Sequence, residues 1–298
     1  MNTRTLARII PSVAASDGAG VKLRRSLGNA QTLRHDPFLM LDEFYSDDPQ
    51  DYLRGFPAHP HRGFETVTYM LDGHMRHEDH LGHRGDLGPG DVQWMTAGRG
   101  IVHSEMPQQT EGRMRGFQLW INLPAKEKMR PPAYRDIAAR EVPVVTLECG
   151  GKVRVIAGTL MQEGRIAEGP ISGGSTNPLY LDVVLPAGGQ FMAPVEPEHN
   201  AFIYLYEGEA WVGDDRRELP MRAAGLLSAG EQVRVDTSQV GARFLLLAGK
   251  PLGEPVVQYG PFVMNTRQEI EQALADYRDG TLTAPAGSGP EQRRSRNG

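Results

Sequence analysis

A sequence pattern typical of a strand, a turn and a second strand occurs twice in this chain. This repeat constrains the fold more than any other feature. Tyr69-Met-Leu-Asp-Gly73 has a counterpart in Tyr204-Leu-Tyr-Glu-Gly208, and Pro89-Gly-Asp-Val-Gln-Trp94 has one in Ala229-Gly-Glu-Gln-Val-Arg234. Repeated segments of this kind indicate structurally related units within one chain. Each pair is expected to belong to a β-barrel, so the repeat predicts two barrels.

The composition favours an all-β architecture of this size. The chain has 298 residues, with 35 glycines, 22 prolines and only short apolar runs, and it is long enough for two small domains or one large one. We expect one barrel in residues 1–130 and the other in residues 131–282. Residues 125–132 are expected to form the connector between them, with charged side chains that face solvent.

A short helix is expected after the second barrel. In residues 266–278, Thr266 and Glu269 fit a capping box. Four residues at intervals of three or four predict one apolar helix face, and they are Ile270, Ala273, Leu274 and Tyr277. Residues 283–298 are rich in Gly, Pro, Ser and Arg, which predicts a disordered tail.

The charge and the cysteine content exclude several classes of protein. A net charge of -5 argues against a general nucleic-acid-binding surface. A single cysteine, Cys149, allows no intrachain disulfide, which fits a reducing compartment. We expect Cys149 to be a small buried hydrophobic residue. The sequence contains neither a run of transmembrane length nor an export signal at its start, so the expected location is the cytoplasm.

Two short segments of the first half each carry a pair of side chains that can bind a metal. These pairs are His59 with His61 and His103 with Glu105, and each adjoins a β-branched and aromatic run that is typical of a strand. Residues i and i+2 of a strand project from the same face, so each pair presents both of its ligands to one side. If the two strands pair, the four side chains converge.

This set of ligands favours a borderline divalent metal. Three imidazoles and one carboxylate leave open coordination positions, as in non-haem Fe(II) or Mn(II) sites. Calcium would require more oxygen ligands, and structural zinc more often uses thiolates.

Four further histidines lie between the two segments, at positions 74, 77, 80 and 83. The surrounding stretch is rich in Gly and Asp, and we interpret His74, His80 and His83 as exposed residues of a hairpin loop. His77 is the exception, because alternation along a strand from Gly73 would turn it toward the same cavity.

The second half lacks an equivalent set of ligands. When the repeats are superposed, Pro194, Glu196 and Asn200 occupy the places of His59, His61 and Glu65.

The other superposed pair places Arg243 and Leu245 where the first half has His103 and Glu105. Because His199 is then the only imidazole of the second half, we expect that half not to bind a metal in the same way.

Three strings resemble the pirin family of the cupin superfamily. They are residues 56–67 (FPAHPHRGFETV), 89–107 (PGDVQWMTAGRGIVHSEMP) and 260–266 (GPFVMNT). The resemblance implies a bicupin, with two jelly-roll barrels and a metal in the N-terminal barrel only.

The family's metal ligands correspond to His59, His61, His103 and Glu105. Iron, as Fe(II), is the expected metal, with Mn, Zn, Ni or another divalent ion as alternatives. Many cupins use the glutamate that falls at Glu65, whereas the pirin pattern uses the one at Glu105. We therefore expect Glu65 to be a hydrogen-bond partner of a ligand.

The resemblance implies quercetin 2,3-dioxygenase activity, in which a flavonol is cleaved with O2 and carbon monoxide is released. Glu105 is then the expected catalytic base for the flavonol hydroxyl. Apolar walls beside the metal are expected from Phe56, Phe64, Met95 and Met106.

The alternative is an iron-dependent redox regulator that binds a protein partner, either a transcription factor or a metabolic enzyme. A sugar isomerase on the same fold is a weaker hypothesis, since the expected walls are apolar.

Overall fold

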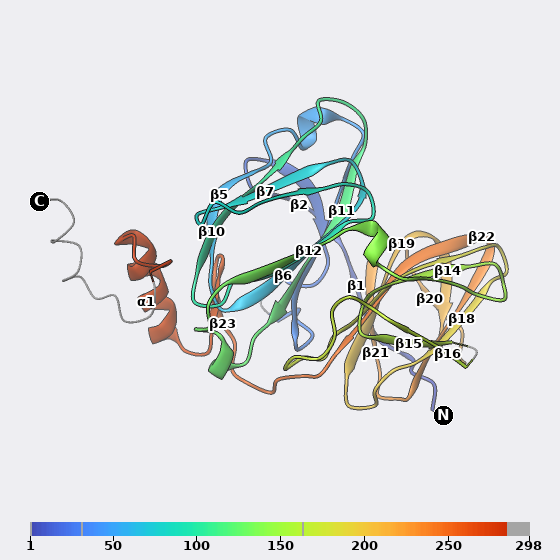
Figure 1. The fold of residues 1–298 in the computed structure, drawn as a ribbon. Coiled ribbons are helices and arrows are strands. Elements are labelled where there is room, and N and C mark those ends of the chain that lie inside the picture. The colour runs from blue at the N-terminus through green and yellow to red at the C-terminus, as the bar shows by residue number, and fades with distance from the viewer. Residues whose placement is uncertain (1, 31, 163, 285–298) are drawn as a thin grey trace, which may run out of the picture.

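The computed structural model describes residues 2–30, 32–162 and 164–284. It confirms an all-β chain in which two jelly-roll halves lie side by side, with a short helix near the C-terminus (Figure 1). The expected tail at 283–298 lies almost entirely outside the described residues. Among the described residues, no helix has the length and apolar character that crossing a membrane would need.

The first half consists of two sheets that face each other. Among the described residues, the larger of these two sheets runs in the order β12 (Ala133–Ile137), β9 (Val92–Thr96), β6 (Phe64–Asp72), β11 (Met114–Asn122), β4 (Phe38–Ser46), β3 (Val21–Arg25) and β2 (Val13–Asp17). The smaller sheet runs in the order β5 (Phe56–His61), β10 (Ile101–Pro107), β7 (Met75–Asp79) and β8 (Arg84–Leu87). Side chains from both sheets meet in the space between them.

The second half is dominated by one large, branched sheet. Its main path is β1 (Leu6–Pro11), β21 (Ala223–Leu227), β19 (Asn200–Val212), β22 (Gln232–Gly249), β17 (Leu179–Leu185), β14 (Lys152–Ala157) and β13 (Val144–Thr146), while β18 (Gln190–Pro194) pairs with β22 and β20 (Arg217–Leu219) pairs with β19. In both halves the described sheets stay open at their edges, so the expected jelly rolls are built from sheets that do not close into a continuous ring of strands.

The remaining elements are short. Two hairpins are formed by β15 (Thr159–Gln162) with β16 (Arg165–Glu168) and by β23 (Val257–Tyr259) with β24 (Phe262–Met264). Three short 3-10 turns are η1 (Pro49–Asp51), η2 (Ala125–Glu127) and η3 (Ala139–Glu141), and the helix is α1 (Arg267–Arg278).

Strand β11 shows how alternation produces this architecture. Phe117, Leu119 and Ile121 are fully buried in the core between the two halves. Gln118 and Trp120 project from the opposite face and line a cavity inside the first half. This division follows from strand geometry, because successive side chains of a strand point to opposite faces.

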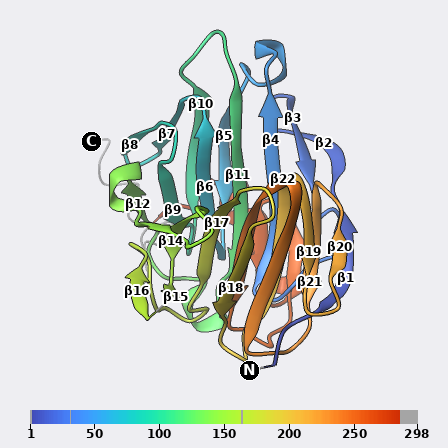
Figure 2. The same cartoon turned by 90° about the vertical axis from the view of Figure 1, so that its right-hand side faces the viewer.

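Several elements cross between the two halves. Strand β1 pairs with β21 at the edge of the second-half sheet, and β12 pairs with β9 of the first half (Figure 2). The expected boundary at residue 130 is therefore crossed twice. Strand β1 precedes it but belongs to the second-half sheet, and β12 follows it but belongs to the first half.

The C-terminal hairpin and helix also pack on the first half, on the side away from the second half (Figure 1). The backbone N–H of Val263 donates to the Arg62 oxygen at 3.0 Å, and the Arg62 side chain forms an ion pair with Asp276 of α1 at 2.7 Å. A Cβ atom at Gly63 would lie 1.9 Å from the Val263 oxygen, so only glycine allows this close approach.

The helix agrees with the predicted cap but not with the whole predicted face. Thr266 and Glu269 form the capping box, and Ile270 and Ala273 are buried. Leu274 and Tyr277, which we expected on the same apolar face, are exposed. The helix packs on the narrow β23–β24 hairpin, which covers only part of that face.

Two further expectations were wrong. Cys149 is exposed, because it lies in the turn between β13 and β14 rather than in a strand that faces the core. Lys128 of the connector is buried. Its Nζ donates hydrogen bonds to the oxygens of Gly63, Asn122 and Val263 at 2.7, 2.6 and 3.0 Å, and burial lowers the pKa of Lys128 to about 8.

Candidate metal centre

Three histidines of the first half form a compact cluster between its sheets. Strands β5 and β10 pair in antiparallel register, which sets His103 opposite His59. His61 follows on the same strand, and ring nitrogens of His59, His61 and His103 lie within 4.8 Å of one another. Within the described part of the chain, this is the only such group of potential ligands. The spacing in the sequence predicted that these imidazoles would converge.

The ring nitrogens of this cluster fit a divalent metal. Both ring nitrogens of His61 and Nε2 of His103 are buried without a hydrogen-bond partner among the described residues. Nδ1 of His59 donates to the Pro57 oxygen at 2.8 Å, which leaves its Nε2 lone pair available. Buried polar atoms without partners are costly, and coordination to a metal would satisfy them.

Electrostatics favours the same interpretation. Burial lowers the pKa of His61 and of His103 well below the usual value, and the neighbouring imidazoles add to this effect. Both rings are therefore neutral at physiological pH, which is the form that binds a metal.

His77 lies directly behind the cluster. It is buried on β7, and its Nε2 lies 2.7 Å from Nδ1 of His103. If His103 binds a metal through Nε2, its Nδ1 carries the proton that is donated to His77, so this contact fixes the orientation of the ligand. Alternation along the strand predicted that His77 would turn toward the other histidines, and its contact with His103 confirms this.

The other histidines of this region do not join the cluster. As expected, His74, His80 and His83 are exposed, and they lie around the β7–β8 hairpin. His83 contacts Asp79 and Tyr134.

Glu105 is buried on β10 next to the cluster. Its carboxylate is not part of the compact group of potential ligand atoms, which consists of the three histidines. Its carboxylate accepts hydrogen bonds from Thr68 Oγ1 at 3.0 Å and from Gln118 Nε2 at 3.3 Å. A register shift in the β5–β10 pairing falls between His103 and Glu105. Thr68 and Gln118 were missed by sequence analysis, because only the pairing of β6 with β11 places them side by side.

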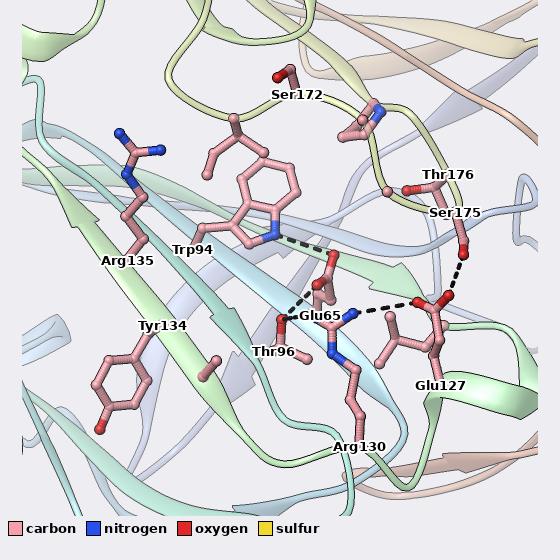
Figure 3. Close-up of a pocket in the computed structure, with 16 residues that line it drawn as sticks. Glu65, Trp94, Thr96, Glu127, Arg130, Tyr134, Arg135, Ser172, Ser175 and Thr176 are labelled. Atoms are coloured by element: carbon pink, nitrogen blue, oxygen red, sulfur yellow. Dashed lines mark hydrogen bonds and ion pairs between the residues drawn. The ribbon is translucent and has the colours of Figure 1, made fainter.

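Glu65 points away from the histidines, contrary to our expectation that it would bond to a ligand. It accepts hydrogen bonds from Trp94 at 3.2 Å and from Thr96 at 2.6 Å, beside Arg130 (Figure 3). The reason is alternation, since Glu65 faces opposite to Thr66 and Thr68 on β6. Burial raises the pKa of Glu65 above its usual value.

The carboxylate of Glu65 lines a second cavity of about 290 Å³ on this outer face of β6. Arg130 forms an ion pair with Glu127, which in turn accepts a hydrogen bond from Ser175 of the second half (Figure 3). These contacts join the connector to both halves of the molecule.

A larger cavity opens beside the histidines. It has a volume of about 600 Å³ and contains His59, His61 and Gln118 on its walls, a size that suits a small organic ligand. Its apolar walls are Leu39, Met40, Phe56 and Trp120.

Only one of the four apolar walls that we expected lines this cavity. Phe56 lines the cavity. Phe64 does not, and its ring packs against the rings of Trp120 and His61, which do line the cavity. Met95 belongs to a separate core cluster, and Met106 packs near Gly55. Walls contributed by β4 could not be predicted, because β4 is remote from the histidines in the sequence.

The equivalent positions of the second half have other roles. Arg243 forms an ion pair with Glu207 at 3.3 Å, and Leu245 is buried in the core. Pro194, Glu196 and His199 line a separate cavity of about 440 Å³.

The chain matches two family models, named Pirin over residues 20–121 and Pirin C-terminal cupin domain over residues 180–283. A Pseudomonas aeruginosa protein, named only provisionally as a quercetin 2,3-dioxygenase, is 56% identical over 270 residues, which are 90% of this chain and 94% of that protein.

Solved structures agree with this assignment. A quercetin 2,3-dioxygenase from Acinetobacter baumannii superposes with a TM-score of 0.84 at 33% identity, over 94% of this chain and 98% of that one. A bacterial pirin from Escherichia coli, solved in complex with nickel(II), shares the fold with a TM-score of 0.63 at 17% identity, over 82% of this chain and 98% of that one. The chain therefore belongs to the pirin family and carries its two cupin domains.

Proposed function

We propose that this protein is a metal-dependent dioxygenase that cleaves flavonols such as quercetin with O2 and releases carbon monoxide. His59, His61 and His103 would hold the metal, with Glu105 as a fourth ligand. The observation that carries this proposal is the cluster of His59, His61 and His103 ring nitrogens. Those of His61 and Nε2 of His103 are buried without a hydrogen-bond partner among the described residues, and His59 and His61 line a cavity of about 600 Å³. The names of the relatives supply the reaction class.

The metal expected at this site is Fe(II), and Mn, Zn, Ni or another divalent ion is the alternative. When bound, such an ion supplies Lewis acidity that lowers the pKa of a coordinated hydroxyl, and a route for reaction with O2.

Side chains in the cavity and beside it supply binding and proton transfer. Glu105 accepts the proton of the flavonol 3-hydroxyl at a carboxylate oxygen, which Thr68 and Gln118 hold in place through their hydrogen bonds. Trp120, Phe56 and the neighbouring apolar side chains bind the planar rings and exclude water.

The proposal is tested with protein reconstituted with Fe(II) and mixed with quercetin in air. We expect loss of the quercetin absorbance together with O2 consumption and release of carbon monoxide. His61→Ala should abolish all three, whereas the exposed His74→Ala should behave like the wild type. Turnover that persists in His61→Ala would contradict the metal-centred mechanism.

The regulatory hypothesis rests on the family resemblance, and no contact in the described residues favours it over catalysis. A partner retained by the Fe(III) form and not by the Fe(II) form, without flavonol turnover, would favour regulation.

A further inference from the structure

A charged group lies across the 600 Å³ cavity from the histidines, on the larger sheet of the first half. Arg25 of β3 donates from Nε and Nη2 to the two carboxylate oxygens of Asp42 at 2.7 and 2.6 Å. Nη2 also contacts Asp17 at 2.8 Å. All three side chains line the cavity, and we call them the Arg25 triad.

The Arg25 triad continues a row of side chains that ends at the metal centre. Arg25, Asp42, Gln118 and Thr68 are direct register partners on β3, β4, β11 and β6. Register partners project from the same face of a sheet, and strands are about 4.8 Å apart. Arg25 is therefore about 10 Å from Gln118 along the row, a span that a three-ring flavonol covers.

The triad offers both a hydrogen-bond donor and acceptors to a ligand. Nε and Nη2 of Arg25 are occupied, while Nη1 has no hydrogen-bond partner among the described residues. Asp42 is buried and holds the guanidinium in place, whereas the Asp17 side chain is 51% exposed. A fixed donor thus lies next to a carboxylate that can still accept a hydrogen bond.

The charge of the triad decides which ligand group it suits. Burial raises the pKa of Asp42 to about 6, so at pH 7.5 the triad holds one cation and two carboxylates. This excess of negative charge disfavours a ligand carboxylate. A neutral hydroxyl suits it, because a hydroxyl can accept from Arg25 and donate to Asp17.

We propose that the Arg25 triad recognises hydroxyl groups on the ring of a flavonol that lies farthest from the histidines. The substrate class would then be polyphenols that are hydroxylated at both ends, and Arg25 would determine specificity. This inference rests on the proposed function, since it assumes that the opposite end of the ligand lies at the metal centre.

The test compares two flavonols, quercetin and galangin, which lacks the distal-ring hydroxyls of quercetin. Dissociation constants are measured without O2 on metal-loaded protein, by quenching of tryptophan fluorescence. We expect the wild type to bind quercetin about tenfold more tightly than galangin, which is the effect of one charge-assisted hydrogen bond. Arg25→Lys keeps the charge beside Asp42 but lacks a second nitrogen, so it should lose this preference.

Arg24→Lys is the matched control, because Arg24 contacts Ser12 at 2.9 and 3.0 Å instead of lining the cavity. It should keep the preference for quercetin. The double variant Arg25→Gln/Asp42→Asn removes both charges of the buried pair and should lose the preference even if Arg25→Lys folds poorly.

Equal binding of the two flavonols by the wild type, or an unchanged preference in both Arg25 variants, would overturn the inference. Turnover is measured separately. Protein that shows the expected preference but cleaves neither flavonol would contradict the proposed dioxygenase activity and would support the role of the triad in binding.

Discussion

At the scale of single residues, the contact between His77 and His103 is expected to tune the metal site. His77→Phe removes the hydrogen-bond partner of His103 Nδ1 while it preserves a ring of similar shape. Loss of such an outer partner typically weakens metal binding by about 10- to 100-fold. Competition with a chelator measures this change.

The exposed His80→Phe serves as the control for this prediction and should leave metal affinity unchanged. His77→Gln retains a hydrogen-bonding group and should recover part of the affinity. Wild-type affinity in His77→Phe would show that the contact does not orient the ligand.

Residue spacing alone was enough to predict three of the proposed ligands. His59, His61 and His103 were recognised because the period of a strand places i and i+2 on one face. The orientation of Glu65 was not recognised, since it depends on which face of β6 meets the smaller sheet. The roles of Gln118 and Arg25 depend on the register between strands that are distant in the sequence, which no local pattern specifies.

At the scale of elements, the connector after β11 is expected to stabilise the turn between β5 and β6. Lys128→Met leaves three buried oxygens without their donor, at Gly63, Asn122 and Val263. We expect the free energy of unfolding to fall by at least about 2 kcal/mol, because buried acceptors without partners are costly. Denaturant unfolding followed by circular dichroism measures this loss.

Lys126→Met is the matched control, since the Lys126 side chain is 78% exposed. Its effect should stay within about 0.5 kcal/mol, as for most surface substitutions. Equal stability of the two variants would mean that the buried ammonium does not hold the turn.

The strands and the helix cap were predictable because they follow from local periodicity and capping. The burial of Lys128 was not, because the acceptors come from segments before and after it in the chain. Likewise, the pairing of β1 with β21 and of β12 with β9 could not be predicted from the sequence. The repeat indicated two units but not which strands pair at their edges.

At the scale of the whole molecule, Asp182 is expected to hold the two halves together. Its carboxylate accepts hydrogen bonds from Tyr69 of the first half at 2.6 Å and from Tyr206 of the second half at 2.5 Å. Asp182→Ala leaves two buried hydroxyls without an acceptor, so we expect a loss of about 2 to 3 kcal/mol in unfolding free energy. Calorimetry should show a lower Tm.

Asp214→Ala is a suitable comparison, because the Asp214 side chain is 65% exposed and should change stability little. If Asp182→Ala melted at the wild-type temperature, the tyrosine contacts would not contribute to the association of the halves.

The central claim is that this chain binds one metal ion through the three histidines of its first half. The most direct measurement is the metal content per chain after reconstitution with Fe(II), determined by elemental analysis for the wild type, His61→Ala, His103→Ala and His199→Ala. We predict about one ion per chain for the wild type and for His199→Ala, and near zero for the other two variants. A wild type without metal, or His61→Ala and His103→Ala with full occupancy, would contradict the account.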